Sequence, residues 1–295
     1  MHIGIDLGAT KIESVVLKKD GSELQRSRLE SPKDYNKTLE VITNIVNNIE
    51  KKYKKKLDVG VCHPGSSNID TGLIQNAFNS PWLNNKNFAN DISKNLSRKI
   101  YCENDANCFA LSEAFDGSAK NYKTVFGIIL GSGCGGGLII NKKIITGPNA
   151  FTGEWGHIPI GKPDSKDNIE EYISGKGLER QFYSKFEINL TAKKIFENAR
   201  LNSINEIELI NDFKNNLGRS LSLIINMIDP DAIVFGGGVS NEIESLDQIK
   251  NITEKYLSNF NNIKKINLKT FFLKPKYGDS SGVRGAAILS RQNSI

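Results

Sequence analysis

The chain contains two copies of one local pattern, a strand followed by a glycine-containing turn and a second strand. The two copies consist, in order, of His2–Leu7, Gly8-Ala9-Thr10 and Ile12–Lys18, and of Thr124–Leu130, Gly131–Gly137 and Leu138–Ile140. Short apolar runs bounded by glycine are typical of strands joined by turns. The sequence therefore predicts two halves that each begin with a strand pair, although the internal similarity is too weak for a sequence repeat.

Strand and helix patterns alternate after each copy, which is typical of a mixed α/β fold. The first half is expected to contain strands at Ser22–Leu29, Leu57–Cys62 and Ile100–Cys102, and helices at Thr38–Lys56, around Phe88–Leu96 and at Ala106–Phe115. The second is expected to contain a helix at Ile204–Ile228, a strand at Ala232–Phe235, a helix from the following glycines to about Asn259, a strand at Ile266–Phe272 and a terminal helix from Gly282. A length of 295 residues fits about two domains, and we expect the crossing between them near residues 116–123.

Charge and cysteine content restrict the class of protein. The chain has 39 Lys and Arg against 33 Asp and Glu, a net charge of +6, and lysine runs such as residues 51–56 are typical of a solvated surface. The sequence contains no run of about 18 apolar residues, so we expect no membrane-spanning helix. The four cysteines form no CxxC pair and the N-terminus lacks a signal-peptide pattern, so we expect free thiols and a soluble cytoplasmic protein.

The first glycine turn, Asp6-Leu7-Gly8-Ala9-Thr10-Lys11, contains groups that suit a phosphate. Gly8 lets backbone amides approach an anion closely, while Thr10 and Lys11 add a hydroxyl and a cation. The Asp6 carboxylate suits Mg²⁺ held through water, because magnesium prefers oxygen ligands and keeps much of its hydration. A plain β-hairpin is the alternative interpretation.

The second glycine segment formally contains the pattern G-x-G-x-x-G at Gly131, Gly133 and Gly136. A dinucleotide-binding fingerprint requires a helix after the glycines, whereas residues 138–143 predict a strand and a turn. A Walker A sequence is also absent. We therefore predict a phosphate loop between two strands, with a purely structural role for the glycines as the alternative.

A third glycine group, Gly236-Gly237-Gly238, follows a predicted strand and precedes a predicted helix. Exposed amides at a helix start can face a nucleotide, and a tight strand-to-helix turn is the alternative.

Elsewhere, Glu103-Asn104-Asp105-Ala106-Asn107 joins a strand to a helix. Asp105 is therefore either a structural cap of that helix or a base that accepts a proton from a substrate hydroxyl at the carboxyl end of a strand.

The loop Gly153-Glu154-Trp155-Gly156-His157, with Glu170 further on, brings one imidazole and two carboxylates together in the sequence. Such groups suit recognition of neighbouring hydroxyls. A zinc site needs about four ligands, and no cysteine follows His157, so we expect these residues to bind no zinc.

Together, these motifs resemble the ROK family of sugar kinases and repressors, within the actin-like, ribonuclease H-like ATPase superfamily. The resemblance rests on Asp6–Lys11, Glu103–Asn107, Leu130–Gly137, Gly153–His157, Phe235–Ser240 and the tail Gly278–Ala287. It implies an α/β fold of two ribonuclease H-like domains with a ligand cleft between them. The expected domains are 1–118, completed by the C-terminal helix 282–295, and 119–281, which would carry the dimer contact.

The resemblance also implies roles for individual residues in transfer of the γ-phosphate of MgATP to the 6-hydroxyl of a sugar. Asp105 is similar to the general base, and Asp6 to the residue that assists Mg²⁺. The expected phosphate and nucleotide contacts are Gly8, Thr10, Lys11, Gly131, Ser132, Gly133, Gly236, Gly237 and Gly238. The expected sugar contacts are Gly65, Asn79, Asn104, Asp105, Glu154, His157 and Glu170.

The chain departs from the family pattern after His157. Many members follow the Gly-His pair with a Cys-x-Cys-Gly-x-x-Gly-Cys zinc segment that ends in Ile-Glu, whereas here residues 158–168 lead to Ile169-Glu170 without a cysteine. We therefore expect no structural zinc. His157 is then either a sugar contact or a packed side chain.

The identity of the sugar is the least constrained part of the prediction. Asn79–Asn84 and Tyr277–Gly285 resemble bacterial fructokinases (manno-fructokinases), while Asn104–Glu113 and Ile144–Gly147 equally resemble N-acetylglucosamine kinases. We expect phosphorylation of fructose to fructose 6-phosphate, with N-acetylglucosamine, N-acetylmannosamine or glucose as the alternative.

Two other functions remain as rivals. ROK repressors carry a DNA-binding helix-turn-helix before the first phosphate motif, and here that motif begins at residue 4, so we expect no nucleic-acid partner. The second rival is a sugar sensor that has the same fold and no catalytic activity. The presence of Asp105 and of both phosphate loops argues against it. Family members often form dimers, so we expect a homodimer with no membrane partner.

Overall fold

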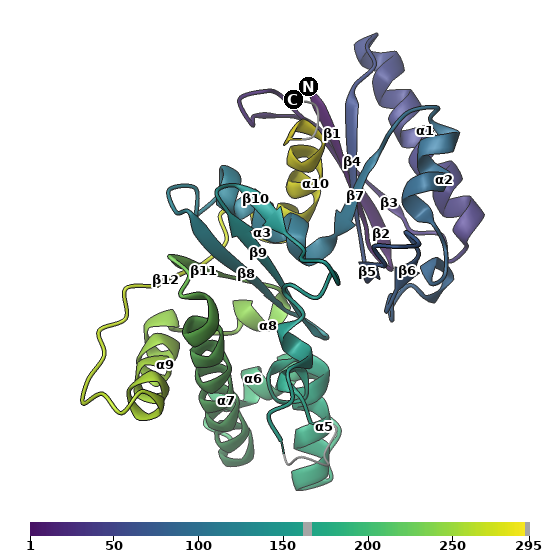
Figure 1. The fold of residues 1–295 in the computed structure, drawn as a ribbon. Coiled ribbons are helices and arrows are strands. Elements are labelled where there is room, and N and C mark those ends of the chain that lie inside the picture. Colours follow the sequence, from purple (N-terminus) through teal and green to yellow (C-terminus); the bar gives the residue numbers. More distant parts are fainter. Residues whose placement is uncertain (162–166, 293–295) are drawn as a thin grey trace.

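The structure is a computed structural model that describes residues 1–161 and 167–292. Two five-stranded sheets, each with helices against it, form the two halves of the molecule (Figure 1). The first sheet contains β1 (His2–Leu7), β2 (Lys11–Leu17), β3 (Glu23–Glu30), β4 (Asp58–His63) and β7 (Tyr101–Asn104). The second contains β8 (Thr124–Leu130), β9 (Cys134–Ile140), β10 (Lys143–Ile145), β11 (Ala232–Gly236) and β12 (Phe271–Leu273), and a separate short pair is formed by β5 (Ser66–Ser67) and β6 (Ile74–Gln75).

The helices cluster around these sheets. They are α1 (Tyr35–Tyr53), α2 (Phe88–Asn95), α3 (Asp105–Phe115), α4 (Ile169–Ile173), α5 (Gly175–Phe186), α6 (Ala192–Arg200), α7 (Ile204–Ile228), α8 (Gly238–Asn241), α9 (Leu246–Phe260) and α10 (Ser281–Gln292). Short 3-10 turns occur at Pro81–Leu83, Trp155–His157 and Gly278–Ser280. None of the helices in the described part of the chain is long and apolar enough to cross a membrane.

The two sheets have the same topology. Their strand orders are β3-β2-β1-β4-β7 and β10-β9-β8-β11-β12. In each, the first strand pairs antiparallel with the second and parallel with the fourth, as β1 does with β2 and β4, and β8 with β9 and β11. The two strand–glycine–strand units found in the sequence therefore begin two halves of equivalent architecture.

Amphipathic helices cover the outer faces of the sheets. In α1, Ile42, Ile45, Val46 and Ile49 are buried at helical spacing, and the Asp34 side chain caps the helix by accepting a hydrogen bond from the Lys37 amide at 2.9 Å. These residues join β1, β2, β4 and α2 in one apolar core. A second core lies between the other sheet and α5–α7 and α9.

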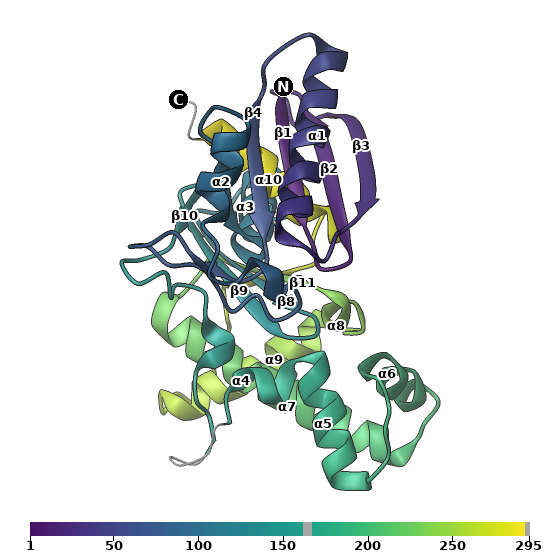
Figure 2. The same cartoon turned by 90° about the vertical axis from the view of Figure 1, so that its right-hand side faces the viewer.

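Helices α3 and α10 lie at the junction of the halves. Although α10 follows the second half in sequence, it packs against β1, β4 and α3, and α3 packs in turn against β8 and β9 (Figures 1 and 2). Glycine permits this close packing, because a Cβ at Gly60 would lie 1.9 Å from the Ala286 carbonyl oxygen. The chain thus crosses between the halves twice, at residues 116–123 and 274–280.

The structure corrects the predicted extent of the glycine turn at 131–137. Only residues 131–133 form the turn, and β9 already begins at Cys134. Gly137 serves helix–sheet packing, since a Cβ there would lie 2.8 Å from the Ala106 carbonyl oxygen and 2.9 Å from Asn107 Oδ1, whereas Gly136 faces Gly153 and Trp155 on the other side of the strand. Three of the glycines that suggested a loop therefore belong to a strand that carries α3.

Two predictions near the C-terminus are also wrong in extent. The helix expected to run from the glycines to about Asn259 is broken into α8 and α9, because Ser245 starts a new helix by accepting a hydrogen bond from the Gln248 amide at 3.2 Å. The strand expected at Ile266–Phe272 is limited to Phe271–Leu273. Its neighbour β11 pairs Ala232 with Phe271, so residues before Phe271 have no partner strand.

Candidate functional site

Two cavities lie next to the glycine loop that follows β8. The first, called here the α3 cavity because it surrounds the start of α3, has a volume of about 300 Å³. The second, the α5 cavity, surrounds the start of α5 and has a volume of about 450 Å³. Gly131 and Ser132 line both. The loop therefore separates two spaces that fall within the roughly 300–1,000 Å³ of typical ligand pockets.

The α3 cavity brings together all the sugar contacts expected from the sequence. Its lining includes Gly65, Asn79, Asn104, Asp105, Glu154, His157 and Glu170. These residues come from segments far apart in the chain, which meet because parallel strands end at the same edge of a sheet. The lining contains three carboxylates, an imidazole and several amides, and none of its described residues is lysine or arginine.

Asp105 is the first residue of α3, and the residue before it caps the helix. The Asn104 side-chain oxygen accepts a hydrogen bond from the Asn107 amide at 2.7 Å. The alternative in which Asp105 caps the helix is therefore wrong. Asp105 Oδ1 accepts a hydrogen bond from the adjacent Ala106 amide at 2.8 Å, and its side chain lines the α3 cavity.

The environment of Asp105 raises the pKa of its carboxyl group. The surrounding protein removes bulk water and raises the pKa of this carboxyl, and the negative charge of Glu154 raises it further. The hydrogen bond from the Ala106 amide acts in the opposite direction. A carboxylate with a raised pKa, facing a cavity at a helix start, has the properties of a general base.

Glu154, His157 and Glu170 also line the α3 cavity. His157 Nε2 lies 3.5 Å from Glu154 Oε2, and the His157 side chain is 50% exposed. The His157 side chain is therefore only half-buried, and its contact with a sugar stays a prediction. Glu170 Oε2 accepts a hydrogen bond from the Cys134 amide at 2.6 Å, so this carboxylate also holds the glycine loop in place.

The turn around Asn79 adds an apolar side chain that sequence reasoning missed. Phe78 lines the α3 cavity and is 78% exposed. Its backbone is held by a hydrogen bond from its own amide to the Asn76 carbonyl oxygen, and the Ser80 amide bonds the Ala77 carbonyl oxygen. The signal in the sequence was a large aromatic residue inside an otherwise polar, asparagine-rich turn.

The Gly131–Gly133 loop is fixed by its own backbone and by α5. The Gly131 amide donates to the Gly133 carbonyl oxygen at 3.0 Å. The amides of Gly175 and Lys176, at the start of α5, donate to the carbonyl oxygens of Gly131 and Ser132 at 2.8 and 3.1 Å. The loop therefore keeps one shape at the boundary between the cavities, as a preformed phosphate site requires.

Only one residue of the third glycine group lines a cavity. Gly238 lines the α5 cavity, and no atom lies within 4 Å of a Cβ placed on it. Gly236 instead packs against the Phe109 ring, where a Cβ would lie 2.5 Å from ring carbons, and Gly237 has a φ of +89° beside the Leu130 backbone. The structure therefore gives Gly237 the tight-turn role that the sequence left as the alternative, while Gly236 ends β11 in close contact with Phe109.

The first phosphate motif lies beside the cavities and lines neither of them. The turn is closed by a hydrogen bond from the Gly8 amide to the Lys11 carbonyl oxygen at 3.0 Å. Gly8, Thr10 and Lys11 are absent from the lining of both cavities. Asp6 is close enough to Asp105 for the charges to interact: burial, and then the charge of Asp105, raise the pKa of Asp6 to about 6.

The surroundings of Asp6 fit a hydrated Mg²⁺ ion. Two neighbouring carboxylates, Asp6 and Asp105, place negative charge in a region with little water. Mg²⁺ is held by one or two carboxylates together with water and phosphate oxygens, and needs no dedicated cluster of protein ligands. A Mg²⁺ ion at this place would take Asp6 as one ligand and would be completed by waters and phosphate oxygens.

Replacing Asp6 with asparagine is expected to stabilise the protein at neutral pH. Because folding raises the pKa of Asp6 from 3.8 to about 6, the folded state holds the proton more tightly, and stability falls as pH rises through this window. Removing the charge should raise the free energy of unfolding by roughly 3 kcal/mol at pH 7.5. Urea denaturation at pH 4 and 7.5 measures the effect; a variant less stable than wild type at pH 7.5 contradicts it.

The α5 cavity contains residues that the sequence analysis did not single out. They are Gly175, Lys176, Glu179, Thr191, Ala192, Lys193, Phe196, Val239 and Glu242. Ser174-Gly175-Lys176-Gly177 was the available signal, since Ser174 caps α5 by accepting a hydrogen bond from the Gly177 amide at 3.0 Å. Helices α5 and α6 were not predicted, so their lining residues could not be placed.

The absence of a structural zinc stays a prediction. The segment between His157 and Ile169 includes residues 162–166, which lie outside the described residues. Its sequence contains no cysteine, and zinc needs about four ligands of the cysteine, histidine or carboxylate type. Metal analysis of the purified protein should find far less than about one zinc per chain; stoichiometric zinc that survives dialysis would show the prediction to be wrong.

Comparison with known proteins identifies similar chains over the whole length. The ROK family matches residues 2–293. An N-acetyl-D-glucosamine kinase of Mannheimia succiniciproducens is 35% identical, over 98% of this chain and 99% of the relative.

Solved structures show the same fold. A ROK hexokinase from Thermus thermophilus has a TM-score of 0.87 at 21% identity, covering 99% of this chain and 98% of its own. A ROK family glucokinase from Streptomyces griseus, solved with glucose and AMPPNP, has a TM-score of 0.79 at 26% identity, covering 99% of each chain. The expected α/β fold of two actin-like ATPase halves is thereby confirmed.

Proposed function

The chain belongs to the ROK family, and from this premise we propose that it is an ATP-dependent sugar kinase that phosphorylates the 6-hydroxyl of N-acetylglucosamine. The observation that carries the proposal is the pair of cavities joined at Gly131 and Ser132, with Asp105 in one of them. Two substrates can occupy neighbouring spaces and meet at a backbone loop suited to phosphate.

The α3 cavity suits an uncharged polyhydroxyl compound. Its carboxylates, imidazole and amides can bond to hydroxyl groups as acceptors and donors. Since its described lining residues include neither lysine nor arginine, an anionic substrate would meet negative charge without compensation. A sugar therefore fits this space better than a sugar phosphate or a carboxylic acid.

The α5 cavity suits the nucleotide. Its volume is about 450 Å³, and its lining includes Lys176 and Lys193 together with Glu179, Glu242 and the loop residues Gly131 and Ser132. Phe196 and Val239 supply apolar surface for a base. The Streptomyces griseus relative was solved with the ATP analogue AMPPNP, which supports ATP as the phosphate donor here.

The reaction follows from this placement. As the sugar 6-hydroxyl attacks the γ-phosphorus, Asp105 accepts the hydroxyl proton, the new oxygen–phosphorus bond forms, and the bond to the β-phosphate oxygen breaks to release ADP. The Gly131–Gly133 loop orients the phosphates, and Glu154, His157 and Glu170 orient the sugar. Mg²⁺ near Asp6 would neutralise developing phosphate charge.

Fructose is the second candidate substrate. The stretch Asn79–Asn84 favours it by resemblance to fructokinases, and this preference was the main expectation from the sequence. The relatives do not support that choice: the Mannheimia succiniciproducens protein, similar along its whole length, is an N-acetyl-D-glucosamine kinase. We therefore rank N-acetylglucosamine first.

A coupled ADP-release assay with fructose, mannose, glucose, N-acetylglucosamine and N-acetylmannosamine tests the proposal. N-acetylglucosamine should give the highest kcat/KM of the panel. A higher value for fructose would restore the fructokinase prediction, and ADP release with none of the sugars would contradict sugar kinase activity itself. The division into domains 1–118 with 282–295 and 119–281, the homodimer and the cytoplasmic location remain proposals that this assay does not address.

A further inference from the structure

A fully buried carboxylate lies outside both cavities at the junction of the halves. Glu113 is on α3, two turns of helix beyond Asp105, and has no exposed surface. Oε1 accepts hydrogen bonds from the Ser281 hydroxyl at 2.7 Å and from the Tyr277 amide at 3.3 Å. Oε2 accepts them from the amides of Ser118 and Lys276 at 2.8 and 3.0 Å.

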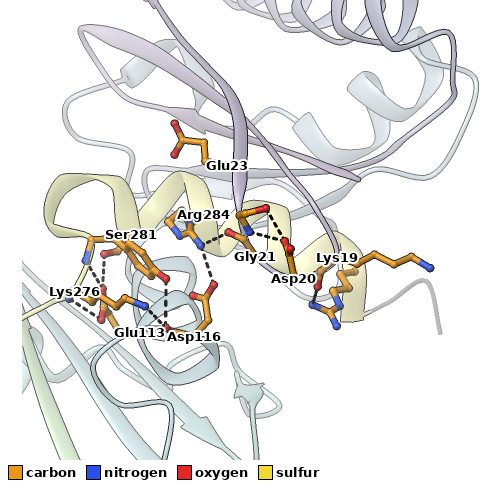
Figure 3. A network of polar contacts seen from close by, with 12 residues as sticks. Lys19, Asp20, Gly21, Glu23, Glu113, Asp116, Lys276, Ser281 and Arg284 are labelled. Carbon is orange, nitrogen blue, oxygen red and sulfur yellow. Dashed lines mark hydrogen bonds and ion pairs between the residues drawn. The ribbon is translucent and has the colours of Figure 1, made fainter.

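The four donors come from both places where the chain crosses between the halves. Ser118 belongs to the first crossing, at 116–123. Lys276 and Tyr277 belong to the second, at 274–280, and Ser281 begins α10. Figure 3 shows the Glu113 carboxylate directed at Lys276 and Ser281, with Asp116 and Arg284 beside them. One side chain of α3 thus ties together the two connections between the halves.

The cations of this region bond a different acidic residue, Asp116. Arg284 bonds Asp116 Oδ2 at 2.8 Å and lies over the Tyr277 ring at 3.8 Å from its centroid. The Lys276 ammonium group donates to the Asp116 carbonyl oxygen at 3.1 Å. Among the described residues no cationic side chain forms an ion pair with Glu113. Four neutral donors instead form hydrogen bonds to the Glu113 carboxylate, and hydrogen bonds to a carboxylate are stronger than those between neutral groups.

We propose that Glu113 is a positioning residue that fixes α3, and through it Asp105, relative to the Gly131–Gly133 loop. The start of α3 is set by packing on β9, where Gly137 approaches Ala106 closely. Its other end is set by Glu113. If this end is released, the helix can tilt, and a displacement of about 1 Å at the reacting groups can cost about a hundredfold in rate.

The inference rests on the proposed role of Asp105, and the variant Glu113→Gln tests it. The substitution keeps the shape but replaces one oxygen by an NH₂ group. Each carboxylate oxygen of Glu113 accepts a hydrogen bond from a backbone amide. Whichever way the glutamine amide is turned, its NH₂ group therefore faces a backbone N–H, and two donors cannot bond. We expect kcat to fall at least about tenfold while both KM values change less than about threefold.

Glu206→Gln is the matched control. Glu206 is also buried and accepts hydrogen bonds from neutral donors, Ser203 Oγ and Asn198 Nδ2, but it lies on α7, away from the crossings. Both variants should lower Tm, and only Glu113→Gln should lower kcat. Ser281→Ala removes a single donor and should fold even if Glu113→Gln does not, with kcat lowered about threefold.

Hydrogen exchange provides a readout that does not depend on activity. In Glu113→Gln or Ser281→Ala, the amides of residues 106–110 should exchange at least about tenfold faster than in wild type, and in Glu206→Gln they should not. The inference would be overturned if these amides exchange at the wild-type rate in Glu113→Gln and Ser281→Ala. It would also be overturned if each of these two variants that folds has the wild-type kcat. Lack of ADP release by the wild-type protein would instead refute the proposed function, while exchange would still decide the role of Glu113.

Discussion

Replacing Asp105 with alanine is expected to lower kcat by about 10²–10⁴-fold, the usual contribution of a general base. Asp105 lines the α3 cavity and not the α5 cavity, so the Kd of the nucleotide should change less than about threefold. Asp105→Asn should show the same loss, since it keeps the shape and removes the base. ADP release measures kcat, and calorimetric titration measures nucleotide binding.

Asp91→Asn is the control for this substitution. Asp91 lies on α2, where it accepts a hydrogen bond from the Tyr35 hydroxyl at 2.7 Å, and it lines neither cavity. Its replacement should leave kcat unchanged. Retention of more than about a tenth of wild-type kcat in Asp105→Ala would show that another group accepts the proton.

The pH dependence should agree with this assignment. Asp105 must be deprotonated to accept a proton, and its pKa is raised by burial and by Glu154. The acid limb of kcat/KM should therefore lie above pH 3.8, the ordinary value for aspartate, with activity rising as pH increases. Asp6, with a pKa of about 6, interacts with Asp105, so the limb reports the two carboxylates together.

Replacing Gly285 with alanine is expected to be the most destabilising change in the helix junction. A Cβ at this position would lie 1.8 Å from the Cys108 carbonyl oxygen and 2.4 Å from its carbonyl carbon. Both atoms are backbone, so relief requires α10 and α3 to separate. We expect a loss of about 3 kcal/mol or more in the free energy of unfolding, and a Tm lower by about 5 °C or more.

Gly238→Ala is the matched stability control, because no atom lies within 4 Å of a Cβ at Gly238. Its Tm should stay within about 2 °C of wild type. Thermal unfolding followed by circular dichroism measures both variants. If Gly285→Ala is as stable as Gly238→Ala, then α3 and α10 can separate without loss of stability. That result would contradict the prediction.

The sequence predicted the elements that local patterns define and missed those defined by contacts. Strand β8 and helix α7 were predicted with their observed bounds, because apolar periodicity and flanking turn residues fix both. The glycines at 135–137 were assigned to a turn and belong to β9. A glycine needed for a turn and a glycine needed for close helix packing look the same in a sequence.

The lining of the α3 cavity was predicted and most of the lining of the α5 cavity was not, for a similar physical reason. Residues of the α3 cavity carry side chains with distinctive chemistry, such as Asp105 and His157, and all of those expected line it. The α5 cavity is formed largely by backbone and ordinary helix residues such as Thr191 and Phe196, which carry no local signal. The role of Asn104 as the helix cap was also missed, because Asn and Asp serve equally well there.

The nature of the product tests the central claim most directly. Incubation of the purified protein with N-acetylglucosamine and MgATP, followed by ³¹P NMR of the product, identifies both the acceptor and the phosphorylated hydroxyl. The account predicts N-acetylglucosamine 6-phosphate, formed in equal amount to ADP. Phosphate on another hydroxyl, or ADP with free phosphate and no sugar phosphate, would contradict it.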